Sequence, residues 1–265
     1  MSRTGSRLSL PLRLTLFFFA SAARGATPSG LALSLDPPRL ELNAEAGAEK
    51  TETVVIANGS RAKVALKIYG LPFSVDEAGR VATGRAAAGP RDASGWLRIN
   101  PAETVVEAGE SAVVRVTLRV PREASGAYWT MVFAESLAPR PLASPASGPE
   151  PVNVGLRVGS YVYVQVGRPE APSVDASLSV GREDGGLAAI CQVVHRSGGV
   201  LRLTARWRAA GSSEEEFVLL PGGRRIVRFQ PQGGLRATEH VQVEIEGSGI
   251  RLRREIMVPA GPGGR

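Results

Sequence analysis

Residues that could do chemistry are few in this chain of 265 residues, and their spacing does not favour catalysis. Cys191 and His195 lie four residues apart in one apolar run, so on a strand they would share a face and could begin a metal site. A third and a fourth ligand at a recognisable spacing are missing, since His240 is far away in the sequence. We therefore expect structural or solvent-facing histidines, a buried structural thiol and no cofactor.

Signatures of nucleophilic catalysis and of phosphate binding are also missing from the sequence. It contains no Gly-x-Ser-x-Gly elbow and no glycine-rich loop ahead of a helix. Asp184-Gly185-Gly186 reads as a hairpin turn, because it lacks the spaced acidic ligands of a calcium loop, and Glu214–Glu216 reads as a solvated run of charges. We therefore predict that the protein is not an enzyme and has no small-molecule substrate.

One stretch instead offers a surface for binding. Val152–Gly167 alternates apolar and other residues and predicts an unusually long strand, with Val152, Val154, Leu156 and Val158 on one face. It follows Leu137–Pro151, which holds five prolines and predicts a flexible loop. A long strand at this place invites pairing with another chain. The alternative, that these side chains fill only their own core, stays open.

Similar alternation over much of the chain predicts the elements that hold this strand. Three runs joined by short turns form a meander, namely Thr104–Val106, Ala112–Val120 and Tyr128–Glu135. Pro37-Pro38 interrupts the first strand and marks an edge or a switch between sheets, because proline cannot donate to a ladder. Seven further short runs follow residue 173. The pattern predicts an all-β protein of two tandem immunoglobulin-like β-sandwiches.

The N-terminal residues carry the pattern of a secretory signal. Arg3, Arg7 and Arg13 precede the short apolar run Leu14–Ala20, and small residues follow up to Ala22. We assign residues 1–26 to a cleaved signal peptide, 27–168 to the first domain, 169–259 to the second and 260–265 to a disordered tail. The predicted location is the periplasm, or outside the cell.

The net charge of +7 does not indicate nucleic-acid binding. It rests almost wholly on arginines, which are spread through alternating strands and are not clustered with aromatic residues. Nucleic acid is therefore not an expected partner.

Several motifs resemble the periplasmic pilus-assembly chaperones of the PapD-like family. They are Ser34–Leu40, the hairpin entry Val54–Ser60, the turn Glu107–Gly109 with the strand after it, and Tyr128–Ser136. In that family the last strand of the first domain is donated to an incomplete pilus subunit, and an arginine and a lysine anchor the subunit's terminal carboxylate. The resemblance implies that Val152, Val154, Leu156 and Val158 are the donor residues.

The resemblance also implies an anchoring role for Arg39, which matches the family arginine. Tyr161 stands near the position of the family lysine, and Arg157 is the only basic residue of the strand. We include Arg157 among the expected partner-binding residues. The predicted function is a non-enzymatic periplasmic chaperone that caps pilus or surface-fibre subunits, with an outer-membrane usher as a possible second partner. The chain is also similar to two-domain surface proteins that bind WxL-domain partners, so the alternative is a cell-envelope protein that contacts surface proteins or peptidoglycan.

Overall fold

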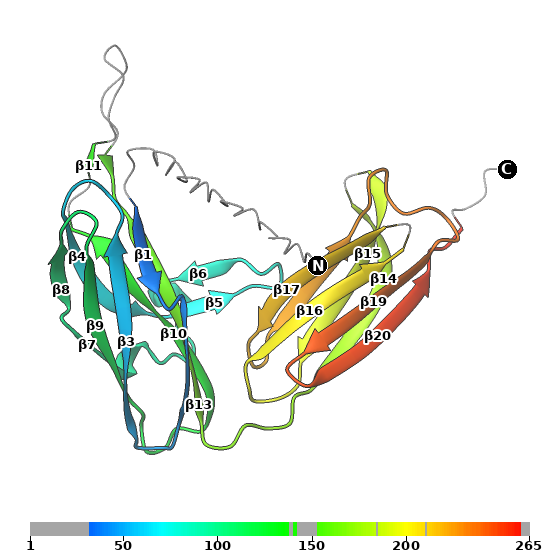
Figure 1. Cartoon of the computed structure of the whole chain (residues 1–265). Coiled ribbons are helices and arrows are strands. Elements are labelled where there is room, and N and C mark those ends of the chain that lie inside the picture. The colour runs from blue at the N-terminus through cyan, green and yellow to red at the C-terminus, as the bar shows by residue number, and fades with distance from the viewer. Residues whose placement is uncertain (1–31, 138–139, 142–152, 184, 210, 261–265) are drawn as a thin grey trace, which may run out of the picture.

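The chain is built almost entirely from β-strands, which form two sandwiches in tandem (Figure 1). The computed structural model describes residues 32–137, 140–141, 153–183, 185–209 and 211–260. The helices in these ranges are two 3-10 turns, Arg85–Ala87 and Ser94–Trp96, and neither is long enough to cross a membrane. The predicted all-β fold of two sandwiches is confirmed. The predicted signal peptide and all of the predicted tail except Ala260 lie outside the described residues.

The first sandwich packs a four-stranded sheet against a five-stranded sheet. Across the smaller sheet the order is β1 (Leu33–Asp36), β3 (Glu49–Asn58), β9 (Ser111–Arg119) and β7 (Leu97–Asn100). Across the larger sheet it is β2 (Arg39–Ala44), β13 (Arg157–Val166), β10 (Gly126–Ser136), β4 (Val64–Leu71) and β8 (Glu103–Val106). Neighbouring strands in both sheets are antiparallel except β2 and β13, which are parallel.

The chain passes from one sheet to the other at Pro37 and Pro38. β1 pairs with β3 in the smaller sheet, whereas β2 pairs with β13 in the larger one. Proline has no backbone N–H, so the first strand cannot continue through these two residues as a regular ladder. The predicted switch between sheets is confirmed, and it places Arg39 at the start of β2.

The core of the first sandwich follows from the two-residue period of its strands. Val114, Val116 and Leu118 of β9 are buried, and Arg115 and Arg119 between and after them are exposed. From the opposite sheet, alternate residues of β13 and β2 complete the same core: Val162, Val164, Val166, Leu40 and Leu42.

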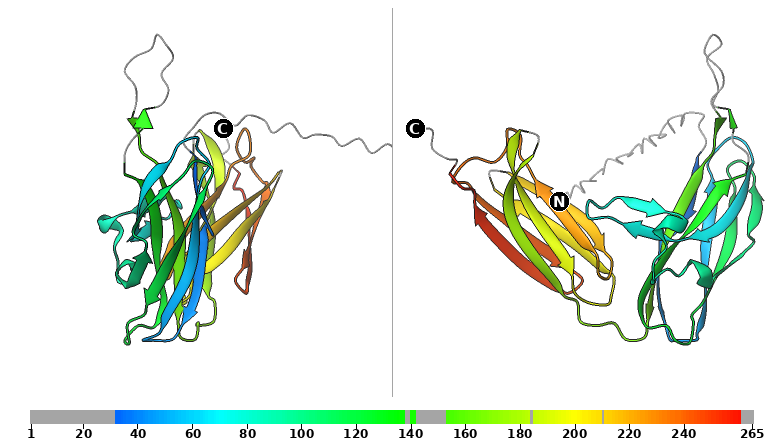
Figure 2. Two further views of the ribbon diagram at one scale, coloured as in Figure 1. Left: turned by 60° about the vertical axis from the view of Figure 1, so that its left-hand side comes forward. Right: turned by 180° about the vertical axis from the view of Figure 1, so that it is seen from behind.

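A small hairpin leaves the first sandwich after β4. It consists of β5 (Phe73–Val75) and β6 (Val81–Thr83), and Figure 2 shows it reaching towards the second sandwich. The N–H of Ile226 in the second sandwich donates to the carbonyl of Glu77 at its tip, at 2.8 Å. The sequence predicted at most one short strand here, because three-residue strands that pair only with each other leave little periodic signal.

The second sandwich has its own core. One of its sheets has the strand order β14 (Val174–Glu183), β15 (Gly186–His195) and β18 (Arg224–Phe229). The other has the order β17 (Ser212–Leu219), β16 (Leu201–Arg208), β19 (His240–Gly247) and β20 (Ile250–Met257). Trp207 and Cys191 are buried in this core, as predicted. Burial raises the pKa of the Cys191 thiol to about 11, so the thiol is a poor nucleophile.

The prediction of one continuous strand over Val152–Gly167 is wrong. β12 (Asn153–Val154) pairs with β11 (Arg140–Pro141) as a separate ladder, and β13 begins only at Arg157. At the break, the N–H of Leu156 donates to the Ser136 side-chain hydroxyl at 2.9 Å, a bond outside a regular backbone ladder. Side-chain alternation alone could not reveal that change of partner.

Candidate partner-binding site

The predicted partner site begins at the first half of β13. β10 covers one side of β13 along its whole length. On the other side, β2 pairs with residues 161–166 only. In the part of the chain that the structure describes, no strand pairs with this second side of residues 157–160, which we call the open edge.

The backbone of the open edge is directed outward at every second residue. The N–H of Tyr161 donates to the carbonyl of Pro38 at 3.1 Å, on the side of β2. Backbone groups alternate in direction along a strand, so those of Gly159 and Arg157 point to the same side. The Ser160 hydroxyl donates to the carbonyl of Pro37 at 2.8 Å and marks where β2 takes over. The open edge therefore presents the backbone groups of two residues to an incoming strand.

The four predicted donor residues occupy different environments. Val158 is half-buried and packs against the core of the first sandwich, and Leu156 is half-buried at the break before β13. Val154 lies in β12, and Val152 lies outside the described residues. The open edge therefore has an apolar neighbour in Leu156, and part of the predicted donor face contributes to the protein's own core.

The resemblance predicted an anchor at Arg39, and the structure places it at the end of the open edge. Arg39 is the register partner of Tyr161 in the parallel pair of β2 and β13. Its Nε lies 2.7 Å from Glu41 Oε1, and about half of the side chain is exposed. The family lysine thus has a neutral tyrosine near its place here, directly beside the arginine.

Arg157 lies away from the position of the missing lysine. It is the first residue of β13, four residues before Tyr161 and therefore roughly 13 Å away along the strand. Its guanidinium lies 4.7 Å from the centre of the Phe133 ring, and its Nη2 donates to Thr83 Oγ1 at 3.4 Å. Arg39 and Arg157 are thus not brought together.

A cleft of about 640 Å³ lies between the two sandwiches, next to the open edge, and we call it the interdomain cleft. The first sandwich contributes Arg39, Gly159 and Tyr161, and the second contributes Arg202, Phe217 and Arg225. Apolar side chains from both sandwiches pack together beside it, with Phe73, Met131, Phe133, Tyr163 and Leu220 buried. This contact positions Arg202 and Arg225 of the second sandwich across the cleft from the open edge of the first.

The second-sandwich arginines of the cleft were not predicted as site residues. Arg202 and Arg225 belong to alternating strands, where each reads as an ordinary solvent-facing residue. In the folded protein the Arg225 side chain is only 13% exposed, forms an ion pair with Glu215, and packs against Gly79 of the hairpin tip. No sequence signal could have found them, because the relation between the two sandwiches brings them to the site.

The electrostatics of the cleft combine buried aromatics with paired charges. The Arg202 guanidinium lies 4.9 Å from the centre of the Tyr163 ring. Burial raises the pKa of Tyr163, so its hydroxyl stays neutral at physiological pH. Glu216 also lines the cleft and places a carboxylate among its arginines. The arrangement suits an apolar segment that carries an anionic group.

The two histidines lie on different strands, His195 at the end of β15 and His240 at the start of β19. His195 is buried; its Nδ1 accepts the N–H of Ser197 at 3.1 Å, and its Nε2 lies 2.6 Å from the Gly199 carbonyl. His240 is half-exposed beside Glu255. Within the described ranges, no three His, Cys, Asp or Glu side chains are grouped to hold a metal ion.

Comparison with known proteins identifies the fold. No family profile matches the sequence, and neither does any curated protein. A chain of the CsuC–CsuE chaperone–tip adhesion subunit complex of Acinetobacter baumannii is 11% identical with a TM-score of 0.50, covering 84% of this chain and 97% of that one. The E. coli chaperone DraB is 13% identical with a TM-score of 0.47, covering 86% and 97%.

A chain of the Salmonella enterica complex of SafA pilin with the SafB chaperone is 9% identical with a TM-score of 0.48, covering 88% of this chain and 99% of that one. At these identities the likeness concerns the fold alone. The resemblance predicted from the sequence motifs is confirmed at that level: this chain has the two-domain fold of the fimbrial chaperones.

Proposed function

We propose that this protein is a periplasmic chaperone that binds an exported fibre subunit by strand pairing along the open edge. The observation that carries the proposal is the half-covered strand β13, whose free side ends beside the interdomain cleft. The fold supports it, since the CsuC–CsuE structure with this fold is a chaperone–subunit pre-assembly complex. The proposed role needs no catalytic residues and no cofactor.

The open edge has what strand addition requires. Unpaired backbone groups supply hydrogen bonds of about 0.5–1.5 kcal/mol each, and apolar side chains near them supply specificity and further free energy. Leu156 is half-buried next to the edge, and burying a leucine fully contributes about 1.5–3 kcal/mol. We infer that Val154 and Leu156 enter the partner, with Val152 before them and Val158 closing the seam on the protein's own core.

A pull-down from the native periplasm tests this proposal. The tagged protein should retain a small exported subunit in a one-to-one complex, identified by mass spectrometry. The double variant Val154→Glu/Leu156→Glu should lose it, because carboxylates at these positions would be buried without partners.

The matched control is Val105→Glu/Val113→Glu, which places two carboxylates on β8 and β9, where the valines are 56% and 61% exposed. The control should retain the subunit, and both variants should unfold at temperatures close to the wild type. Retention of the subunit by the folded double variant would refute strand donation. An empty pull-down with the wild type would favour the alternative of a protein that binds the cell envelope.

A further inference from the structure

The carboxylate of Glu41 connects the two sandwiches beside the interdomain cleft. Glu41 Oε1 lies 2.7 Å from Arg39 Nε in its own sandwich. The same oxygen accepts from Arg202 of the other sandwich, at 2.9 Å from Nε and 2.5 Å from Nη2. Both arginines line the cleft. The free protein therefore already holds two guanidinium groups around one carboxylate oxygen.

We propose that Glu41 is a replaceable stand-in for the terminal carboxylate of the bound subunit, and that Arg202 is the second cation of the anchor. The proposal rests on the proposed function. It assigns to the second sandwich the part that a strand lysine of the first sandwich plays in the proteins that this chain resembles. It also makes Glu41 an internal competitor of the ligand.

The topology of β13 explains why the ligand group is a chain terminus. A strand that pairs with the open edge cannot continue along β13 beyond residue 160, because β2 occupies the same side from Tyr161 onward. Arg39 stands at that junction, as the register partner of Tyr161. A paired strand that runs towards the junction must end or turn away there. A strand that ends there places its terminal carboxylate beside Arg39.

Exposure of the three side chains allows the exchange. They are 49%, 53% and 31% exposed for Arg39, Glu41 and Arg202, so water already screens these ion pairs and each contributes little to stability. An incoming carboxylate thus displaces Glu41 into water at little cost. Within the described part of the chain, Arg202 Nη1 is buried without an acceptor, so Glu41 does not saturate this guanidinium.

The competing interpretation is that the contact of Glu41 with Arg202 only holds the two sandwiches together. The two interpretations predict opposite effects of neutralising Glu41 on the affinity for the ligand. If the contact were only a brace, neutralising either residue would weaken ligand binding in the same way. If Glu41 competes with the ligand, its neutralisation strengthens binding, whereas neutralisation of Arg202 weakens it. Glu216, which also lines the cleft, is left unchanged in both variants.

The test uses the full exported chain and two synthetic peptides of alternating valine and serine, identical except for a terminal carboxylate or a terminal carboxamide. Calorimetric titration gives the ratio of the two dissociation constants. For the wild type we expect the carboxylate peptide to bind about tenfold more tightly, since hydrogen bonds to charged groups are the stronger ones. Arg202→Gln should bring the ratio close to one, and Glu41→Gln should raise it above the wild-type value.

Each result decides between the interpretations. Equal binding of both peptides to the wild type, or an unchanged ratio in Arg202→Gln, would overturn the anchor and leave strand pairing standing. A fall in the affinity of both peptides in Glu41→Gln would also overturn it, in favour of a brace. If neither peptide binds the wild type, the proposed function fails together with the anchor. A circular dichroism melt of each variant confirms that it is folded.

Discussion

Two strand edges of this molecule differ in what they offer to another strand. The open edge of β13 in the first sandwich includes two small residues, Gly159 and Ser160, and one charged residue, Arg157. β20 is the edge strand of a sheet in the second sandwich, and its outward residues are Arg251, Arg253, Glu255 and Met257. One edge is nearly uncharged, and the other is covered by charges.

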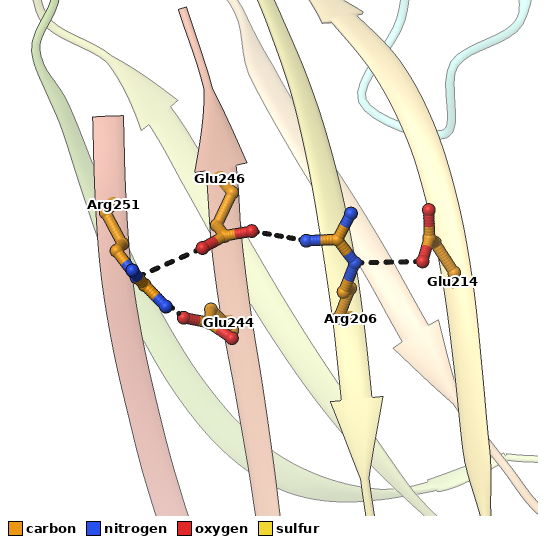
Figure 3. Close-up of polar contacts among 5 residues, drawn as sticks. All are labelled: Arg206, Glu214, Glu244, Glu246 and Arg251. Atoms are coloured by element: carbon orange, nitrogen blue, oxygen red, sulfur yellow. Dashed lines mark hydrogen bonds and ion pairs between the residues drawn. The ribbon is translucent and has the colours of Figure 1, made fainter. Parts of the chain in front are cut away.

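The charges beside β20 form a ladder across the sheet (Figure 3). Arg251 Nε lies 3.0 Å from both Glu244 Oε1 and Glu246 Oε1 on β19. Glu246 also pairs with Arg206 of β16, whose Nε lies 2.9 Å from Glu214 Oε2 on β17. Individually such exposed pairs contribute about 0–1 kcal/mol. They therefore add little to the stability of the second sandwich.

The comparison shows that edge protection is selective in this protein. Natural sheets discourage edge-to-edge pairing with charged side chains, and β20 follows that rule. β13 does not follow it, and its free half lies next to a cleft between two domains. An edge with a single charge at such a place suits pairing to a partner, whereas the charged side chains of β20 discourage pairing there.

Removing the charges of β20 should produce the largest effect. In the triple variant Arg251→Thr/Arg253→Thr/Glu255→Thr the edge keeps its backbone groups and gains residues of high strand propensity. We expect the self-association constant to rise at least tenfold, equivalent to about 1.4 kcal/mol, measured by sedimentation equilibrium. The matched control Arg115→Thr/Arg119→Thr alters β9, an interior strand, and should stay monomeric. A monomeric triple variant would show that charge does not protect this edge.

A smaller effect should follow when the backbone of the open edge loses one donor. Arg157→Pro removes the N–H that points to the partner, and proline is tolerated at the first residue of a strand. Arg157→Ala removes the same side chain but keeps the N–H. The proline variant should bind the subunit about fivefold more weakly than the alanine variant, since one hydrogen bond contributes about 1 kcal/mol. Equal affinities would mean that no ladder forms at residue 157.

The smallest effect concerns the loop after β15, which contacts the first sandwich through a backbone hydrogen bond. Gly198 in this loop accepts the N–H of Ala127 at 3.3 Å, and His195 holds the loop through both ring nitrogens. Burial lowers the pKa of His195, although the bond to the Gly199 carbonyl and the nearby Glu170 raise it in part. The unfolded chain then binds a proton more readily than the folded one.

The free energy of unfolding should consequently decrease as the pH falls below about 6.5, the ordinary histidine value, and should level off below the folded pKa. Urea unfolding between pH 7.5 and 5 measures this change, and His195→Asn should reduce it. A profile that is the same in the variant would place the titrating group elsewhere.

Much of this account could be predicted from the alternation of residue types. Alternating apolar residues such as Val114, Val116 and Leu118 predicted the strands and their buried face, and Pro37-Pro38 predicted the switch between sheets. The break at Leu156 was missed because the chain changes its pairing partner there, from β11 to β10, and side-chain alternation does not record partners. Arg202 was missed because its role depends on how two domains meet, which no local pattern records.

Amide hydrogen exchange, followed by NMR, tests the central claim most directly. In the free protein the amides of Arg157 and Gly159 should exchange much faster than those of Val158 and Ser160, which face β10. After saturation with the alternating valine–serine carboxylate peptide, both should become protected, while the amides of β20 keep their rates. Unchanged exchange at Arg157 and Gly159 in the saturated protein, or new protection at β20 instead, would contradict strand pairing at the open edge.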